Sequence, residues 1–495
     1  MAMTDLLKTS NVLASLLVLL LSYTIIGAIV NYAKLRQFKG PRAAAFSRAW
    51  LFWEECSARL PESQRRALRQ YGSPARIGPD LLVTDDPELI RHMSAPGSRW
   101  TRSHWYDAMK MDPRIDTVFS TRDEQLHTEL KAKEAGGYNG RDIASLEPDI
   151  DARVGDMLYL VRNTYNGLPM DMANIARFFT LDVLSTVAFG SPFGFMAAND
   201  DLWGYNKLNA SFMVVLGLQA NHSSVYNFFT QPWLQALAAP KVTDKSGIGP
   251  ALAFARKAVA ERYGPDGKVK NDMLGHFVDK GLSQVQCEAE AFLQIIAGSD
   301  STTGVMRNVI WMLAGSPPTY ARLRAEVDAA VEAGVTRPVV KYAETSKLPY
   351  LRAVVQETIR IFPPLFGLKS KVTLSGDIFK GIYYPPGTEV CDCNEAVMRN
   401  KDVFGEDAEY FRPERLLEGD EVSRRTRQQT IDTSFGAGRF QCLGKHIAMM
   451  ELHKATFEMI RAFDFQIADP TKGIESIAHN VHIASGLNMI ARPRI

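Results

Sequence analysis

The chain has 495 residues, of which 46% are hydrophobic and 23% are charged, and its formal net charge is +2 at pH 7. A chain of this length can bury a core large enough to enclose a cofactor. The nearly neutral charge balance argues against nucleic acid or another acidic polymer as a partner. The cysteines are too few and too scattered for a disulfide framework, which favours a reducing compartment where a thiol is free to bind a metal. They are Cys56, Cys287, Cys391, Cys393 and Cys442.

The N-terminal region contains one long apolar segment. Residues 11–30 read NVLASLLVLLLSYTIIGAIV, and no charged residue occurs between Lys8 and Lys34. A helix of about 20 residues rises about 30 Å, enough to cross the hydrocarbon core of a membrane. The alternatives are a buried core helix and a cleaved signal peptide, but the segment is long for a signal peptide and shows no small-residue cleavage site. We therefore predict a transmembrane helix over about 11–30, within an N-terminal anchor of residues 1–33.

Charges that flank this segment predict its orientation. Several basic residues follow it before the first acid, Glu54, and this bias places the C-terminal bulk of the chain in the cytosol. From Gly40-Pro41 onward, no Gly/Ser tract and no repeat marks a second boundary, so residues 34–495 are expected to form one large domain. The basic residues are Lys34, Arg36, Lys39 and Arg42.

Helical patterns dominate the middle of the chain, and the Pro317-Pro318 pair terminates the longest one. Two short strand-like pieces, Ile378–Tyr384 and Glu389–Cys393, lie in the last third. Cys391 and Cys393 are two apart on a predicted strand and point the same way, and we interpret them as packing residues. The sequence predicts a mainly α domain with a minor β part. The predicted helices are Asp149–Asn163, Met172–Phe189, Asn271–Gly281, Gln286–Leu313 and Thr319–Ala333.

The segment from Phe435 to Gly444, FGAGRFQCLG, brackets Cys442 with glycines at 436, 438 and 444, and a helical pattern starts just after it. Glycines let backbone approach a flat ligand closely and supply amides that can point at the sulfur. A helix that begins near the cysteine directs its N-terminal dipole at the thiolate, which stabilises the anion. A structural turn with an inert cysteine is the alternative. The pattern favours Cys442 as the axial thiolate ligand of a haem iron.

Three further motifs follow the order and spacing found in the cytochrome P-450 family, which this chain resembles over essentially its whole length. They are AGSDST at 297–302, ETIR at 357–360 and FRPER at 411–415. The segments AGGYNGRD, AGSDSTT and QCLGKHIAMMEL are most similar to filamentous-fungal members of the pisatin-demethylase-like kind, which often serve secondary metabolism. The resemblance implies a cytochrome P-450 fold that binds haem b and receives NADPH-derived electrons from a separate reductase.

The motif at 297–302 implies a proton relay. By resemblance, Ala297 and Gly298 form a groove over the haem, and Asp300 and Ser301 form the acid–alcohol pair that delivers protons to bound oxygen. Most members carry threonine where this chain has Ser301, so the methyl group that restricts the hydroxyl rotamer is absent. The relay could therefore shift to Thr302. A helix face packed on a neighbour is the alternative for these small residues.

Other matched positions imply structural and cofactor contacts. Glu357, Arg360 and Arg415 would form a buried charge network that holds the cysteine loop. His127 and Lys131, at i and i+4 on a helix, would face a haem propionate. The position two before the cysteine is usually Arg or His but is Phe440 here. The remaining implied cofactor contacts are Arg439, one place earlier than Phe440, together with Lys371, Phe435, Gly436 and Gly444.

The expected reaction is insertion of one oxygen atom into a lipophilic small molecule by an enzyme on the endoplasmic reticulum membrane, with its catalytic domain in the cytosol. Expected partners are membrane lipid, the NADPH–cytochrome reductase and, as a second candidate donor, cytochrome b5. A basic patch around Lys131, Lys133, Arg424, Arg425, Arg427, Arg439 and Lys445 would steer the reductase. Apolar positions expected to contact substrate are Phe119, Phe212, Leu216, Leu365, Phe366 and Leu487.

Two alternatives from other classes remain. A haem-thiolate isomerase or dehydratase would need no reductase, and the retention of Asp300 with a hydroxyl at 301 argues against it. A non-enzymatic membrane haem-binding protein would not need the relay at all, so loss of the Asp300 carboxylate would leave its function intact.

Overall fold

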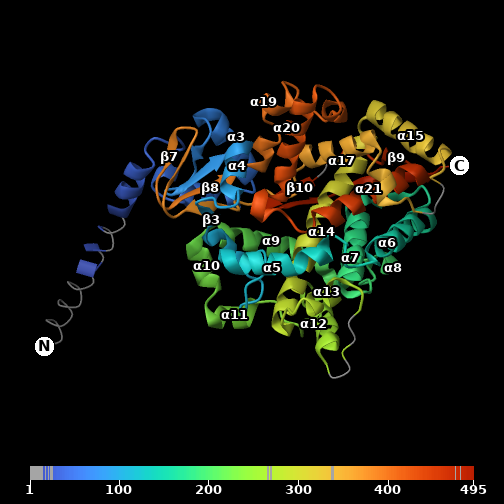
Figure 1. Ribbon diagram of the computed structural model, residues 1–495, viewed down its shortest axis with the longest axis horizontal. Coiled ribbons are helices and arrows are strands. Elements are labelled where there is room, and N and C mark those ends of the chain that lie inside the picture. Colours follow the sequence, from blue (N-terminus) through green and yellow to red (C-terminus); the bar gives the residue numbers. More distant parts are fainter. Residues whose placement is uncertain are drawn as a thin grey trace.

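The computed structural model describes residues 15, 16, 18, 19, 22, 26–264, 267, 270–335, 339–473, 475–479 and 481–494. These residues form a mostly helical body with a few small sheets (Figure 1), which confirms the predicted mainly α class. The α-helices are α2 Ala49–Cys56, α3 Leu60–Tyr71, α4 Pro87–Ser94, α5 Glu124–Tyr138, α6 Leu146–Leu160, α7 Met172–Phe189, α8 Phe195–Ala198, α9 Tyr205–Asn221, α10 Ser223–Phe229, α11 Pro232–Ala238, α12 Gly249–Tyr263, α13 Met273–Asp279, α14 Gln284–Ala314, α15 Pro317–Glu332, α16 Tyr342–Thr345, α17 Pro349–Ile361, α18 Asn394–Val397, α19 Lys401–Phe404, α20 Glu421–Asp432 and α21 Lys445–Ala462.

Short helical turns connect several of these elements. They are η1 Ala43–Ala45, η2 His104–Met109, the π-helical turn η3 Val161–Tyr165, η4 Leu202–Gly204, η5 Pro413–Leu416, η6 Thr433–Phe435 and η7 Gly438–Phe440.

The larger sheet has the order β1-β2-β8-β5-β3, and a smaller sheet has the order β4-β12-β9. Two hairpins, β6–β7 and β10–β11, complete the β part. The strands are β1 Ala75–Arg76, β2 Leu81–Thr84, β3 Trp100–Arg102, β4 Pro169–Asp171, β5 Lys371–Thr373, β6 Asp377–Phe379, β7 Ile382–Tyr384, β8 Thr388–Asp392, β9 Phe463–Ile467, β10 Glu475–His479, β11 Val481–Ser485 and β12 Asn488–Pro493.

Helix α14 is the central element, and it packs on α7, α12, α17 and α21. The Ser283 hydroxyl caps its first turn by accepting from the Gln286 N–H at 3.2 Å. The helix ends at Ala314, and Pro317 then starts α15 in the first-turn position that proline tolerates. Most side chains along α14 are buried, because neighbouring helices cover it on several sides.

The predicted elements agree well with this architecture. Helix α7 has the predicted bounds, because the Asp171 carboxylate caps its start and Gly190, in the left-handed region, ends it. The single strand predicted over Ile378–Tyr384 is wrong. Lys380 and Gly381 both have positive φ, so the segment turns into the β6–β7 hairpin. Cys391 and Cys393 are 1% and 2% exposed, as packing residues would be.

The predicted transmembrane span over 11–30 lies largely outside the described residues. Residues 26–34 are helical and project from the body at the N-terminal end (Figure 1). Ile26, Ile29 and Val30 are 61%, 58% and 58% exposed. Within the described ranges, the one helix long and apolar enough to cross a membrane is α7, and 89% of its span is buried inside the body.

Candidate active site

The loop that carries Cys442 is shaped by glycines at two left-handed positions. Gly436 has φ +75°, and a Cβ there would lie 2.5 Å from the Phe440 carbonyl oxygen. Gly438 has φ +52°, and a Cβ there would clash with the Ser94 carbonyl of α4. The Cys442 N–H donates to the Phe435 carbonyl at 2.7 Å and closes the loop. The loop therefore needs glycine at both positions for steric reasons as well as for φ.

Backbone amides surround the Cys442 sulfur. Helix α21 begins at Lys445 with Gly444 as its N-cap, and the N–H groups of both residues bond to the thiol. Cys442 is an exposed residue, yet its thiol lies deep enough that desolvation raises its pKa. The two amides and the charges of Lys131 and Lys445 act in the opposite direction and favour the thiolate.

Lys131 lies one turn along α5 from His127, as its spacing predicts, but its Nζ donates to the loop. Its partners are the carbonyl oxygens of Arg439, at 2.6 Å, and Gln441, at 3.1 Å. Burial lowers the pKa of Lys131, and Arg102 lowers it further. Lys131 thus holds the cysteine loop against α5, a contact that the sequence did not indicate.

A cluster of cations surrounds the ring of Phe440, where the family usually has Arg or His. Arg102 Cζ lies 4.9 Å from the ring centroid, Arg439 Cζ 4.7 Å and Lys371 Nζ 5.6 Å. The His127 ring centroid is 5.4 Å from that of Phe440. We call Arg102, Lys371 and Arg439 the cation cluster.

The cluster is built by strand register. Arg102 of β3 and Lys371 of β5 are directly paired, so two like charges lie side by side. They are 4% and 7% exposed, and burial lowers the pKa of both, that of Lys371 to about 8. Burial, followed by Arg102 and Lys131, lowers the pKa of His127 to about 3, so its ring is neutral near pH 7.

This excess of buried positive charge needs an anionic partner. Arg102 donates to the carbonyls of Val118 and Thr121, but its Nε has no partner in the described part of the chain. Glu124 lies 3.5 Å from Arg439 Nε and is partly exposed. Two carboxylates of a haem, close to Cys442, match this charge and position, so the residues fit that cofactor. Sequence reasoning missed Arg102, because only the β3–β5 register places it beside Lys371.

Helix α14 presents a partly open face in the middle of a buried run. Ala297 is exposed, whereas Gly298 and Ser301 are half-buried. The Ser301 hydroxyl donates to the Ala297 carbonyl at 3.0 Å, and Thr302 is 5% exposed. Leu443, next to Cys442, packs with Leu130 of α5 and Leu293 of α14, so the cysteine loop faces this helix.

Gly298 serves helix packing. A Cβ at Gly298 would lie 3.0 Å from Leu184 Cδ1, so the missing side chain lets α14 approach α7 closely. This interior glycine therefore allows two helices to pack closely. The sequence analysis gave such packing as the alternative to the predicted groove.

The Asp300 carboxylate points from α14 toward α7 and α9. Its Oδ2 accepts from the Asn209 amide at 2.6 Å, and its Oδ1 lies 3.4 Å from Arg177 Nη2. Arg307 lies in the same buried group, where burial lowers its pKa to about 10 and Asp300 opposes that effect. Sequence reasoning missed Arg177 and Asn209. The signal in the sequence that could have indicated Arg177 was a charged residue inside a mostly apolar helix.

The predicted substrate contacts lie in two environments. Phe119 packs against the rings of Trp105 and Tyr106 from η2, and η2 contacts α9. Phe212 and Leu365 are partly buried beside the main core, whereas Leu216 is 7% exposed. Phe366 and Leu487 are 2% and 0% exposed. The structure therefore groups Phe119 with the α9 residues and places the last two in buried packing positions.

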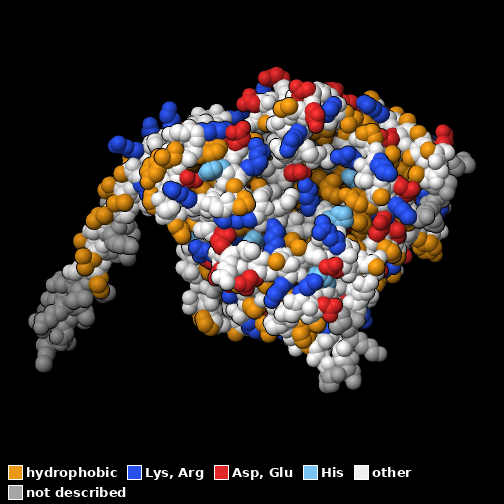
Figure 2. Space-filling view, in the orientation of Figure 1, with side chains coloured by type: hydrophobic (Ala, Val, Ile, Leu, Met, Phe, Trp, Pro, Cys, Tyr) orange, Lys and Arg blue, Asp and Glu red, His pale blue; other side chains and the backbone are white. Residues whose placement is uncertain are grey.

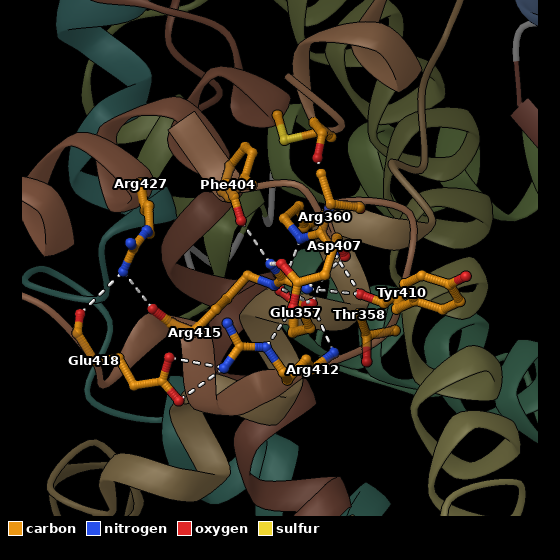
Figure 3. A network of polar contacts seen from close by, with 12 residues as sticks. Glu357, Thr358, Arg360, Phe404, Asp407, Tyr410, Arg412, Arg415, Glu418 and Arg427 are labelled. Carbon is orange, nitrogen blue, oxygen red and sulfur yellow. Dashed lines mark hydrogen bonds and ion pairs between the residues drawn. The ribbon is translucent and has the colours of Figure 1, made fainter. Parts of the chain in front are cut away.

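The structure brings Glu357, Arg360 and Arg415 together in a buried network (Figure 3). Arg360 makes two bonds to the Glu357 carboxylate, at 2.7 and 2.8 Å, and Arg415 Nε donates to it at 2.9 Å. The remaining guanidinium donors reach Asp407 and the carbonyls of Met398, Phe404, Asp407, Ala408 and Tyr410. Every charge in the network has partners, as a buried ionic group requires.

A pair of buried carboxyl groups joins α5 to α14. Glu134 and Glu290 are both 0% exposed, and each shifts the pKa of the other. Glu290 also accepts from the Val118 N–H at 2.8 Å and from Gln286 at 2.9 Å. Burial raises the pKa of both groups, and the charge of Glu290 raises that of Glu134 further. The pair therefore retains a proton that exposed carboxylates would release.

A thiol bracketed by glycines, a facing long helix with an acid–hydroxyl pair and a cluster of unbalanced cations define a haem-thiolate protein. Comparison with known proteins agrees, because a profile of the cytochrome P-450 family matches residues 88–488. The chain belongs to the cytochrome P-450 family and is a monooxygenase of it, which uses haem and an electron-donating redox partner.

The chain is similar to several fungal enzymes over almost its whole length. Cytochrome P-450 monooxygenase ABA1 of Pyricularia oryzae (strain 70-15) is 37% identical over 98% of this chain and 97% of its own length. The enzyme aba1 of Botryotinia fuckeliana (strain B05.10) is 35% identical over 92% and 91%. The enzyme abl1 of Leptosphaeria maculans is 32% identical over 94% and 85%.

Replacement of Arg102 tests the cation cluster. We expect Arg102→Gln to weaken haem binding by about 10-fold or more, because a charge-assisted bond contributes about 1.5–3 kcal/mol. Absorbance titration of the apoprotein with haem measures this affinity. Arg99→Gln removes an equal charge from an exposed neighbour and should bind haem like the wild type. Equal affinities of Arg102→Gln and wild type would show that the cluster does not hold the cofactor.

Removal of one cation tests the buried network. Arg415→Ala leaves the Glu357 charge underpaired and should lower the free energy of unfolding by about 3–5 kcal/mol. Arg412→Ala is the matched control. Its guanidinium is 39% exposed and pairs with Asp407 and Glu418, so the loss should stay below about 1 kcal/mol. Urea unfolding of both variants measures these changes. Equal losses of unfolding free energy in the two variants would contradict the structural role of the network.

The Glu134–Glu290 pair predicts a pH-dependent stability. Because the folded pKa values are raised, the folded state binds more protons than the unfolded state. Their contribution is fully present below the unfolded pKa of about 4.3 and is lost as pH rises through the folded values. Glu134→Gln cannot ionise, so its unfolding free energy should fall less between pH 5 and pH 8. Glu129→Gln, exposed on the same helix, should keep the wild-type slope. If the unfolding free energy of Glu134→Gln changes with pH as that of the wild type does, the Glu134–Glu290 pair does not cause the pH dependence.

Proposed function

We propose that this enzyme inserts one oxygen atom from dioxygen into a C–H or C=C bond of a lipophilic small molecule in fungal secondary metabolism. Two electrons come from NADPH through a separate reductase and two protons come from solvent, and the second oxygen atom leaves as water. The observation that carries the proposal is the Cys442 thiol on a loop whose Leu443 packs on Leu293 of α14, the helix that also carries Asp300 and Ser301. When bound, haem supplies the reduction of dioxygen and the transfer of its oxygen atom.

Asp300 and Ser301 act as the proton-delivery pair, with Thr302 next to them on the helix. Asn209 and Arg177 fix the Asp300 carboxylate on the side of α14 that faces α7 and α9. The Ser301 hydroxyl lies on the more open face and bonds to Ala297. In this proposal, the Asp300 carboxylate takes up a proton from solvent, and a small rotation of its side chain then delivers that proton to the Ser301 hydroxyl.

A lipophilic substrate fits the residues around η2 and α9. Phe212 and Leu216 lie on α9, Phe119 packs against η2, and all three are apolar. A pocket lined by hydrophobic and aromatic side chains binds mainly by burial of apolar surface.

Electrons enter on the side of the cysteine loop. Of the predicted basic patch, Lys131, Arg427, Arg439 and Lys445 are engaged in contacts within the chain. Lys133, Arg424 and Arg425 are exposed. Figure 2 shows Lys and Arg side chains over the centre of this face, between α5 and α20. The exposed members would steer an acidic reductase surface, or cytochrome b5 as a second donor.

The body itself carries apolar side chains suited to a membrane surface. Phe52 and Trp53 of α2 are 44% and 66% exposed, and Phe228 and Trp233 of the α10–α11 region are 55% and 62% exposed. The Phe52 ring contacts His222 edge-on, and His222 joins α9 to α10. The exposed side chains of α2 therefore lie beside the α10–α11 region. The described N-terminal helix adds a row of hydrophobic side chains (Figure 2). These surfaces and the basic residues 34–42 support a single-pass anchor in the endoplasmic reticulum with a cytosolic catalytic domain.

Comparative mass spectrometry of the natural producer tests the proposal. Replacement of the chain by Cys442→Ala removes the iron ligand and should abolish one metabolite, while a precursor poorer by one oxygen atom accumulates. Membranes prepared from the same cells should retain the wild-type chain after an alkaline carbonate wash. Unchanged metabolites with Cys442→Ala protein present would refute the assigned chemistry.

Asp300→Asn separates catalysis from cofactor binding. Its turnover should fall by about 10²-fold, because proton delivery contributes on that order, and its haem content should persist. Asp200→Asn, an exposed residue at the start of the segment before α9, should retain wild-type turnover.

A further inference from the structure

A cavity of about 310 Å³ lies against the cysteine loop between α16, α17, α20 and α21. It is distinct from the open face of α14, because it shares no lining residue with the Asp300–Ser301 segment or with the predicted substrate contacts. We call it the proximal cavity. Its lining residues are Tyr342, Ser346, Arg352, Gln356, Ile359, Gln428, Ile431, Asp432, Phe435, Lys445, Met449 and His453.

One wall of the proximal cavity presents polar groups without partners. His453 is 3% exposed, and neither of its ring nitrogens has a hydrogen-bond partner in the described part of the chain. Burial lowers the pKa of His453 to about 4, and Arg352 adds to that effect, so the ring is neutral and offers one N–H donor near pH 7. A buried polar group left unpaired costs about 1–3 kcal/mol, so this histidine indicates a ligand.

Arg352 and Gln356 complete this wall. They are four residues apart on α17, so their side chains lie on the same face. Among the residues that the structure describes, no carboxylate forms an ion pair with Arg352, and the Gln356 side chain has no hydrogen bond. The wall therefore combines one free positive charge with two neutral donors.

The rest of the lining of the proximal cavity is largely apolar, with Ile359, Ile431, Phe435 and Met449. The acid that lines it, Asp432, is already neutralised. Lys445 Nζ lies 2.8 Å from its carboxylate, and Gln428 donates to it at 3.1 Å. Asp432 therefore adds little repulsion toward an anion at Arg352 and leaves no free negative charge for a cationic ligand.

We propose that the proximal cavity binds a small organic carboxylate, with its carboxylate on Arg352, Gln356 and His453 and its apolar part against Ile431, Phe435 and Met449. One free cation balances a monoanion but not a dianion, which favours a carboxylate over a phosphate. A cavity of about 150 Å³ holds benzene, so about 310 Å³ accommodates an aromatic ring with an acid group. The bound ligand contacts Phe435 and Lys445, which hold Cys442 through a carbonyl and an amide.

Isothermal titration of the holoenzyme with sodium benzoate tests the proposal, and benzamide serves as the neutral isostere. We expect saturable benzoate binding that weakens by about 10-fold or more in Arg352→Gln and in His453→Phe. Benzamide should bind the wild type no more tightly than benzoate binds the two variants. Arg69→Gln, which removes an equal charge from the exposed side of α3, should bind benzoate like the wild type. Gln356→Trp, which fills the cavity, should abolish binding.

Three outcomes would overturn the proposal. Absence of benzoate binding to the wild type would show that the cavity has no affinity for this class. Equal affinities of wild type and Arg352→Gln would place the benzoate at another site, such as the substrate pocket. If benzoate does not bind but Arg352→Gln slows electron transfer from the reductase, the cavity accepts an acidic side chain of that partner instead.

Discussion

The fixed position of the Cys442 thiol is the constraint on which the rest of the structure depends. Backbone bonds within the loop set its shape, but neighbouring elements fix its position in the molecule. Lys131 binds two of its carbonyls from α5, Arg439 binds the Trp100 carbonyl of β3, and the start of α21 supplies two amides to the sulfur. Because each contact comes from a different element, the thiol faces α14 only when α5, the larger sheet and α21 are packed together.

Two groups of buried cations show opposite solutions to the same electrostatic problem. Around Glu357, the guanidinium groups of Arg360 and Arg415 are neutralised by the carboxylates of Glu357 and Asp407 and saturated with carbonyl acceptors. Around Phe440, Arg102 and Lys371 lie side by side with an unused donor and a lowered pKa. A saturated group can only stabilise the fold, whereas an unsaturated one has free energy to gain from an anion. The balance between buried cations and their anionic partners therefore distinguishes the structural network from the ligand site.

Much of the site could be predicted from local sequence. The glycine pattern identified the cysteine loop, and the helical spacing placed His127 beside Lys131 and Glu357 beside Arg360, because i, i+3 and i, i+4 neighbours meet on any helix. The bounds of α7 followed from its apolar run between an aspartate cap and a glycine. The strand over 378–384 was wrong because a two-residue turn with positive φ is easily hidden in an apolar alternation.

The sequence by itself determined the helical class, the thiolate candidate and the ordered motifs, because each depends on residues close together in the chain. Only the tertiary structure decided which groups meet across elements. Strand register paired Arg102 with Lys371, and helix packing brought Asn209 and Arg177 to Asp300. The tertiary structure also turned Lys131 toward the loop, and within the described residues it left His453 beside Arg352 without a hydrogen-bond partner. Register and packing are set by the shape of the whole core, so no local pattern encodes them.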